Sequence, residues 1–118
     1  MTTQEIANRL VELCNANEYE KCYKELYSPD VQSIEADGSM VQGFEAMAKK
    51  GKEWNEGIEK MNGGGAGTPV VSGNHFSVPM WMDVQFKGAP QAIKFEEICV
   101  YQVQDGKIVK EQFFYDKM

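Results

Sequence analysis

The sequence has one histidine and three cysteines, too few for most metal centres or disulfide frameworks. Cys14, Cys22 and Cys99 have no metal-ligand spacing, and their odd number predicts reduced thiols, as in cytoplasmic proteins. His75 has no second histidine and no cysteine at ligand spacing, so we expect no metal site.

Long apolar runs and basic clusters are also missing. No stretch approaches the length of a membrane span, and the N-terminus lacks the basic and apolar regions of a signal peptide. The net charge is −6, with acidic and basic residues interspersed. Nucleic acids and anionic membranes bind basic surfaces, so we expect neither as a partner. A chain of 118 residues supports one core, which predicts a single domain over residues 1–118.

Three amphipathic helices are predicted in the first half of the chain. Residues 2–5 have the Thr-x-x-Glu form of a capping box, and apolar residues then repeat at helical spacing to about Asn15. An Asn-x-x-Glu start at residues 17–20 predicts a shorter second helix, which Pro29 prevents from continuing. The longest apolar stripe predicts a third helix over residues 43–61.

The second half is predicted to form long antiparallel strands. The glycine-rich segment NGGGAG lacks the GK[ST] of a phosphate loop, so we expect a flexible connection there. Strands are predicted over residues 70–86 (interrupted at 72–74), 92–103 and 108–115. A short strand VQSIEA, with MVQ as its return arm, precedes the third helix. This order favours an α+β fold, with the helices packed on one face of a curved sheet.

The last two strands are predicted to form a hairpin with a carboxylate on its apolar face. An Asp-Gly pair at residues 105–106 is a strong turn signal, and counting from it sets Cys99 opposite Gln112 and Glu97 opposite Phe114. Because side chains alternate along a strand, one face should carry Phe95, Glu97, Cys99, Tyr101, Val103, Ile108, Gln112 and Phe114. A register shift of one residue would turn Glu96 inward instead, so the sequence leaves the inward face open.

Three segments carry a family resemblance: LYSPDV after the second helix, the long helix after a glycine, and the terminal VYQVQDGKIVKEQFFYD. With the order of elements, they resemble a SnoaL-like member of the NTF2-like superfamily over essentially the whole chain. The resemblance implies a cone, in which three helices of the N-terminal half pack on a strongly curved, mainly antiparallel sheet around an apolar pocket. It also implies a homodimer formed through the sheet, for which an outward Trp81 is a candidate contact.

The ketosteroid isomerases of this superfamily imply the catalytic positions. Their general base falls on Glu35, which is otherwise a solvated acid at a strand end, and their protonated oxyanion-hole Asp falls within about one residue of Glu97. Their oxyanion-hole tyrosine falls on Leu10, which has no proton to donate. Since losing one such donor typically costs about 10²–10³ in rate, we do not expect a strict steroid isomerase. His75 is a further candidate, because imidazole exchanges protons near neutral pH, although its turn predicts surface exposure.

Two functions remain open at this stage. One is a cofactor-independent enzyme of the isomerase, cyclase or dehydratase type, in which Glu35 removes a proton from a small hydrophobic carbonyl compound and protonated Glu97 stabilises the enolate. The other is a non-catalytic module that binds a small hydrophobic ligand or serves only for dimerisation. In either case we expect the pocket to be lined by Leu10, Tyr23, Tyr27, Trp54, Ile58, Cys99, Tyr101, Gln112 and Phe114.

Overall fold

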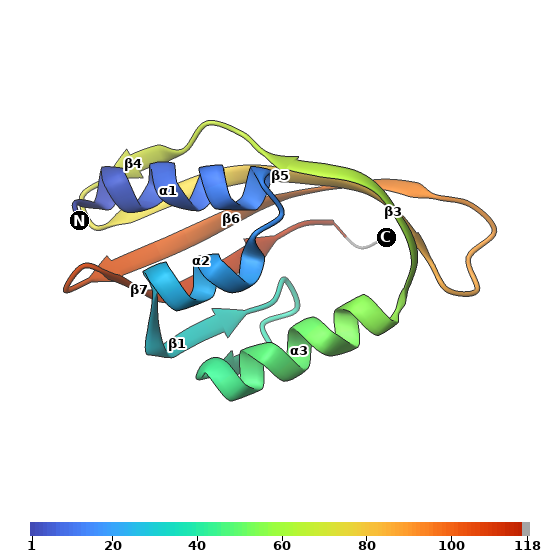
Figure 1. Ribbon diagram of the computed structural model, residues 1–118, viewed down its shortest axis with the longest axis horizontal. Coiled ribbons are helices and arrows are strands. Elements are labelled where there is room, and N and C mark those ends of the chain that lie inside the picture. The colour runs from blue at the N-terminus through green and yellow to red at the C-terminus, as the bar shows by residue number, and fades with distance from the viewer. Residues whose placement is uncertain (117–118) are drawn as a thin grey trace.

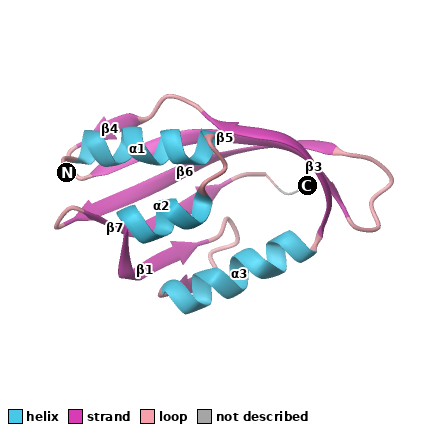
Figure 2. Cartoon of the chain, viewed as in Figure 1, coloured by secondary structure: helices cyan, strands magenta, loops and turns pink. Residues whose placement is uncertain are grey.

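The computed structural model describes residues 1–116, with three helices on one face of a seven-stranded sheet (Figure 1). The helices are α1 (Thr3–Asn15), α2 (Tyr19–Leu26) and α3 (Phe44–Glu56). The strands are β1 (Tyr27–Ile34), β2 (Met40–Gln42), β3 (Ile58–Ala66), β4 (Val70–Ser72), β5 (His75–Phe86), β6 (Ile93–Gln104) and β7 (Lys107–Phe114). The predicted α+β fold, with its helices in the first half of the chain, is confirmed (Figure 2).

The sheet is strongly curved, and α3 bridges its two edges. The strands lie in the order β2-β1-β7-β6-β5-β3, with β4 paired to the start of β5. Every neighbouring pair is antiparallel except β1 and β7, which run parallel. Helix α3 contacts β1 and β2 at one edge and β3 at the other, while α1 and α2 pack side by side farther along the sheet (Figure 1).

Helix α1 begins with the predicted capping box and buries the predicted apolar stripe. The Glu5 N–H donates to Thr2 Oγ1 over 3.1 Å, and the Thr2 N–H donates to Glu5 Oε1 over 2.9 Å. No helix among residues 1–116 is long and apolar enough to cross a membrane. The most deeply buried core residues come from α1, α2 and the inner faces of the strands: Ile6, Leu10, Leu13, Leu26, Val31, Phe76, Val78, Val84, Cys99 and Ile108.

Two predicted helix boundaries were wrong. Helix α3 ends at Glu56 rather than near Met61, and residues 58–66 form β3 against β5. The glycine-rich segment is therefore part of a strand and not the flexible connection that its composition predicted. Helix α2 begins at Tyr19, because Asn17 has a φ of 58° and lies in the left-handed region instead of capping the helix.

Close packing against Trp81 accounts for glycine in β3. A Cβ atom at Gly65 would lie 2.9 Å from Trp81 Nε1 and 3.3 Å from Asn15 Oδ1. Asn15 also ties the end of α1 to this strand, since its Oδ1 accepts from the Ala66 N–H over 2.8 Å and its Nδ2 donates to the Ala66 carbonyl over 3.1 Å. The glycines thus allow β3 to lie against the Trp81 indole. The strand keeps its pairing with β5 and its hydrogen bonds to Asn15 at the end of α1.

A β-bulge interrupts the final hairpin. The turn is at the predicted residues and Val103 pairs with Ile108, but Gln102 pairs with Lys110. Val109 is therefore an extra residue on β7, which reverses the inward and outward alternation of the strand beyond it.

The bulge changes which β7 side chains enter the interior. Glu111 is buried and Phe113 half-buried, whereas Gln112 and Phe114 face outward, so the predicted inward orientation of those two residues was wrong. The β6 face is as predicted, with Phe95, Cys99, Tyr101 and Val103 buried and Glu97 half-buried on the same side.

We predict opposite stability effects for two glycine-to-alanine substitutions. Gly65→Ala should lower the free energy of unfolding by about 1–3 kcal/mol, because the added methyl group meets Trp81 and Asn15. Gly51→Ala should raise it by up to about 1 kcal/mol, because that position lies within α3 and a Cβ there has no atom within 4 Å. Urea denaturation of both variants and the parent tests this, and a Gly65→Ala protein as stable as the parent contradicts the packing argument.

Candidate functional site

A cavity of about 830 Å³ lies between α3 and the inner face of the sheet. Its apolar wall includes Met47 and Trp54 from α3 and Phe95 and Phe113 from the sheet. The polar side chains that line the cavity are Tyr23, Ser33, Glu35, Asp37, Ser39, Lys49, Lys50, Glu53, Glu97, Glu111 and Tyr115. A cavity that combines aromatic side chains with charged groups suits a small molecule with an apolar body and a polar end.

Four residues that the sequence proposed for the site line this cavity together: Glu35, Glu97, Tyr23 and Trp54. The other proposed residues lie elsewhere. His75 is exposed at the start of β5, opposite Gln102. Ile58 is half-buried where β3 begins, and Leu10, Tyr27, Cys99 and Tyr101 belong to the buried core behind the cavity.

Glu97 reaches the cavity from β6 and is half-buried there. Burial raises the pKa of Glu97 to about 7, and the negative charges of Glu35 and Glu111 act in the same direction. The Cys99 thiol donates a hydrogen bond to Glu97 Oε1 over 3.5 Å, which opposes part of this rise in pKa, as does Lys50. Near neutral pH the carboxyl group is therefore present in both its protonated and ionised forms, as a general acid requires.

Glu35 lies one residue beyond β1 and forms an ion pair with Lys50 of α3. Its Oε1 faces the Lys50 ammonium, and its Oε2 accepts a hydrogen bond from the Tyr115 hydroxyl over 3.2 Å. Burial and the Glu35 charge raise the pKa of Tyr115, so that hydroxyl keeps its proton. Both oxygens of Glu35 are thus engaged, one by Lys50 and the other by Tyr115.

Glu111 is a third acid at the cavity and was not found from the sequence. It is 3% exposed, and it accepts hydrogen bonds from the Tyr27 hydroxyl over 2.5 Å and from the Ser33 hydroxyl over 2.7 Å. Burial raises the pKa of Glu111, while those two bonds and the Lys50 charge oppose the rise. Lys50 Nζ in turn donates to Ser33 Oγ over 2.8 Å. A continuous hydrogen-bonded chain therefore runs from Tyr27 in the core to Lys50 at the cavity.

The sequence held a signal for Lys50 but none for Glu111. Lys50 follows Met47 by three residues and precedes Trp54 by four, which is the spacing of the buried face of α3. Glu111 faces inward only because of the bulge at Val109, and no glycine or proline beside that residue marks the bulge.

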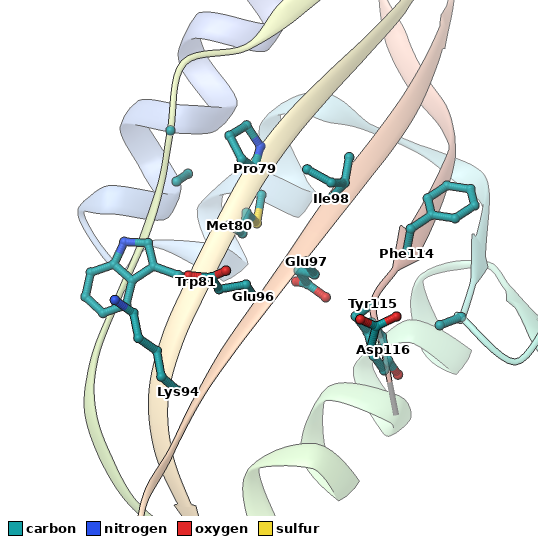
Figure 3. A pocket seen from close by; sticks show the side chains of 13 residues that line it. Pro79, Met80, Trp81, Lys94, Glu96, Glu97, Ile98, Phe114, Tyr115 and Asp116 are labelled. Carbon is teal, nitrogen blue, oxygen red and sulfur yellow. The ribbon is translucent and has the colours of Figure 1, made fainter. Parts of the chain in front are cut away.

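A second hollow, of about 920 Å³, lies on the outer face of the sheet (Figure 3). Trp81, Ile98 and Phe114 point into it and are 42%, 46% and 48% exposed. Lys94 Nζ lies 5.3 Å from the centroid of the Trp81 ring. Glu97 lines this hollow as well as the inner cavity, so its carboxyl group stands at the boundary between them.

Among residues 1–116, no group of three or more His, Cys, Asp or Glu side chains is arranged to hold a metal ion. The charged groups of the cavity instead pair with one another and with hydroxyl groups, as the Glu35–Lys50 ion pair and the bonds of Glu111 illustrate.

Comparison with known proteins agrees with this fold. Residues 1–115 match the SnoaL-like domain family. The chain belongs to this family. A candidate SnoaL-like polyketide cyclase from Mesorhizobium loti is 30% identical, with a TM-score of 0.90 over 98% of this chain and 100% of the other. None of the curated proteins matches the sequence.

More distant solved structures share the fold alone. A candidate SnoaL-like polyketide cyclase from Jannaschia is 16% identical, with a TM-score of 0.79 over 98% of this chain and 89% of the other. A protein from Catenulispora acidiphila with a ketosteroid isomerase-like fold, in complex with trimethylamine, is 18% identical, with a TM-score of 0.77 over 98% and 88%. The resemblance inferred from the order of elements is thus confirmed at the level of family and fold.

We predict that Glu97 titrates with an apparent pKa of about 7 in a carboxyl-detected NMR titration. The folded protein then holds a proton that the unfolded chain loses near pH 4.5, so stability falls as pH rises from about 4.5 to 7 and is level above that. Glu97→Gln should remove this dependence, which corresponds to about 3 kcal/mol at most. Glu96→Gln, on the exposed neighbour, is the control. An unshifted Glu97 contradicts its burial in the wall of the cavity.

Proposed function

We propose that this SnoaL-like protein is a cofactor-independent acid–base enzyme that acts on a small, mostly apolar carbonyl compound. The observation that carries the proposal is the pair of unlike carboxyl groups in one cavity. Glu35 is paired with the Lys50 ammonium, whereas burial raises the pKa of Glu97 to about 7. Carboxyl groups held in different protonation states are suited to act as base and acid in the same reaction.

In this mechanism Glu35 removes a proton from the carbon next to the carbonyl, and Glu97 donates its proton to the carbonyl oxygen. A C–H bond breaks, the substrate gains an O–H bond, and the product of the step is an enol. The Tyr115 hydroxyl donates a hydrogen bond to Glu35 Oε2, the oxygen that does not face Lys50, and so holds the carboxyl group in place. Isomerisation, aldol-type cyclisation and dehydration all begin with this proton removal, which links the proposal to the candidate polyketide cyclases among the relatives.

The test is enzyme-catalysed hydrogen–deuterium exchange at carbon, followed by NMR in D₂O with 2-indanone, an apolar ketone with exchangeable α-hydrogens. The protein should accelerate exchange above the buffer rate, and Glu35→Gln and Glu97→Gln should each lower that acceleration by about 10²-fold or more. Glu45→Gln should leave it unchanged, because that exposed side chain of α3 does not line the cavity. A Glu35→Gln protein that exchanges like the parent rules out the assigned base.

The alternative is a binding protein, and one observation favours it. Both oxygens of Glu35 are already engaged, by Lys50 and by Tyr115, so the resting cavity holds no free base. A binding protein would shift the NMR signals of Glu97 on addition of 2-indanone and give exchange no faster than buffer. The exchange experiment therefore separates the two functions.

We also propose that a second copy of the chain covers the outer hollow, as the expected homodimer requires. Ile98 pairs across the sheet with Pro79 on β5 and with Phe114 on β7, which makes one apolar row. Lys94 and Glu96 flank this row with opposite charges, so a twofold arrangement can set each lysine against the partner's glutamate. The three buried cysteine thiols accord with the cytoplasmic location that we expect for such a dimer.

Sedimentation velocity tests the dimer. The parent protein should sediment as a dimer at micromolar concentration, and Ile98→Lys should convert it to a monomer, because a charge in the apolar row has no partner there. Gln102→Lys, farther along the same strand and outside the hollow, should stay dimeric. A monomeric parent protein at tens of micromolar contradicts the proposal.

A further inference from the structure

Lys50 has one N–H donor that the described protein does not use. An ammonium group has three N–H donors. Within residues 1–116, Lys50 Nζ meets two oxygen acceptors, Glu35 Oε1 and Ser33 Oγ. Lys50 also lines the cavity, and its Nζ lies 5.0 Å from the centroid of the Phe113 ring. The remaining N–H is therefore available to an oxygen of a bound molecule.

The buried chain behind Lys50 fixes the position of its ammonium group. Ser33 has a single hydroxyl hydrogen, which it donates to Glu111, so its oxygen can accept from Lys50. Glu111 is held in turn by the Tyr27 hydroxyl, and it is 3% exposed. A donor fixed before the ligand arrives stabilises negative charge without the cost of reorganising its surroundings.

The surroundings of Lys50 favour a flat, conjugated molecule. The aromatic rings of Trp54, Phe95, Phe113 and Tyr115 line the same cavity, and Phe95 and Tyr115 pack edge to face with ring centroids 4.8 Å apart. Glu35 lies beside Lys50, and although both of its oxygens are engaged, each keeps a second lone pair that can accept a proton. A ligand with an acidic hydroxyl group on a conjugated ring would meet a proton acceptor and a fixed cation at one point.

We infer that Lys50, held by Ser33 and Glu111, forms an oxyanion site, and that the cavity takes conjugated apolar enols or phenols. The ligand enters neutral and transfers its hydroxyl proton to Glu35: the ligand O–H bond breaks, a Glu35 O–H bond forms, and the resulting oxyanion stays beside Lys50. The total charge of the cavity does not change, so no uncompensated charge is buried. This inference deepens the proposed function, because a carbonyl substrate would bind in the same cavity, beside the same proton acceptor, Glu35.

The test uses 2-naphthol, whose neutral and ionised forms have different absorption spectra. At pH 7, where 2-naphthol is neutral in water, the bound molecule should show the naphtholate band. Lys50→Met should lower the bound naphtholate fraction at least tenfold, and Ser33→Ala should lower it less, because Lys50 keeps its charge but loses its support. Lys52→Met, an exposed lysine of the same helix, should match the parent.

Naphthalene binding serves as the control for an intact cavity, since naphthalene has no oxygen to meet Lys50. It should be the same in the parent and in Lys50→Met. If Lys50→Met does not fold, Lys50→Arg, which keeps the charge, should retain the naphtholate band. The inference is overturned if the parent protein binds 2-naphthol only in its neutral form. It is also overturned if Lys50→Met keeps the naphtholate band. Naphtholate binding without 2-indanone exchange would refute the proposed enzyme and leave the oxyanion site standing.

Discussion

The bulge at Val109 determines the chemistry of the cavity. It reverses the alternation of β7, so that Glu111 faces inward beside Ser33, its neighbour across the parallel β1–β7 pair. In a regular hairpin Lys110 and Gln112 would occupy the inner face instead. The cavity would then hold a lysine and an amide where it now holds a buried carboxylate. The hydrogen bonds from Lys50 to Ser33 and from Ser33 to Glu111 therefore depend on this single extra residue. So does the position of the Lys50 ammonium beside Glu35.

Charge placed in a low-dielectric region is costly unless it is paired and hydrogen-bonded. The acids of the cavity differ in the number and strength of the donors that they have. Glu111, the most buried of its acids, has two hydroxyl donors. Glu35 has an ammonium group and a phenol. Glu97 has only a thiol, a weak donor, so it compensates for burial by keeping its proton and its pKa rises to about 7. The three carboxyl groups therefore differ in their donors, and Glu97 has the weakest one.

Local signals in the sequence were sufficient for much of the fold. The capping box at residues 2–5 and the Asp-Gly turn at residues 105–106 act between near neighbours, so they identify their elements directly. The alternation of β6 correctly turned Glu97 inward, because that strand pairs with β5 without a bulge. The same alternation failed on β7, where one inserted residue reverses the face and leaves no mark in composition.

Long-range contacts account for the other differences between expectation and structure. The glycine-rich segment reads as a loop in isolation, and only the indole of Trp81, at the middle of β5, shows why a strand there needs glycine. Lys50 lies at helical spacing from Met47 and Trp54, so the pattern places it on the inward side of α3. The groups that it meets there follow from α3 bridging both edges of the sheet, which no local pattern specifies.

The ion pair between Glu35 and Lys50 connects the two proposed functions, because an enzyme and a binding protein would both use it. An ion pair weakens a base only while its cation stays directed at it. An oxyanion that develops on a ligand competes for the same ammonium, so the pairing with Glu35 loosens as negative charge moves to the ligand oxygen. Ser33 and Glu111 hold Lys50 from behind during this exchange, which keeps the cation in place for either partner. A binding protein and an enzyme would then differ in where the proton taken by Glu35 comes from: a hydroxyl group in one case and a carbon atom in the other.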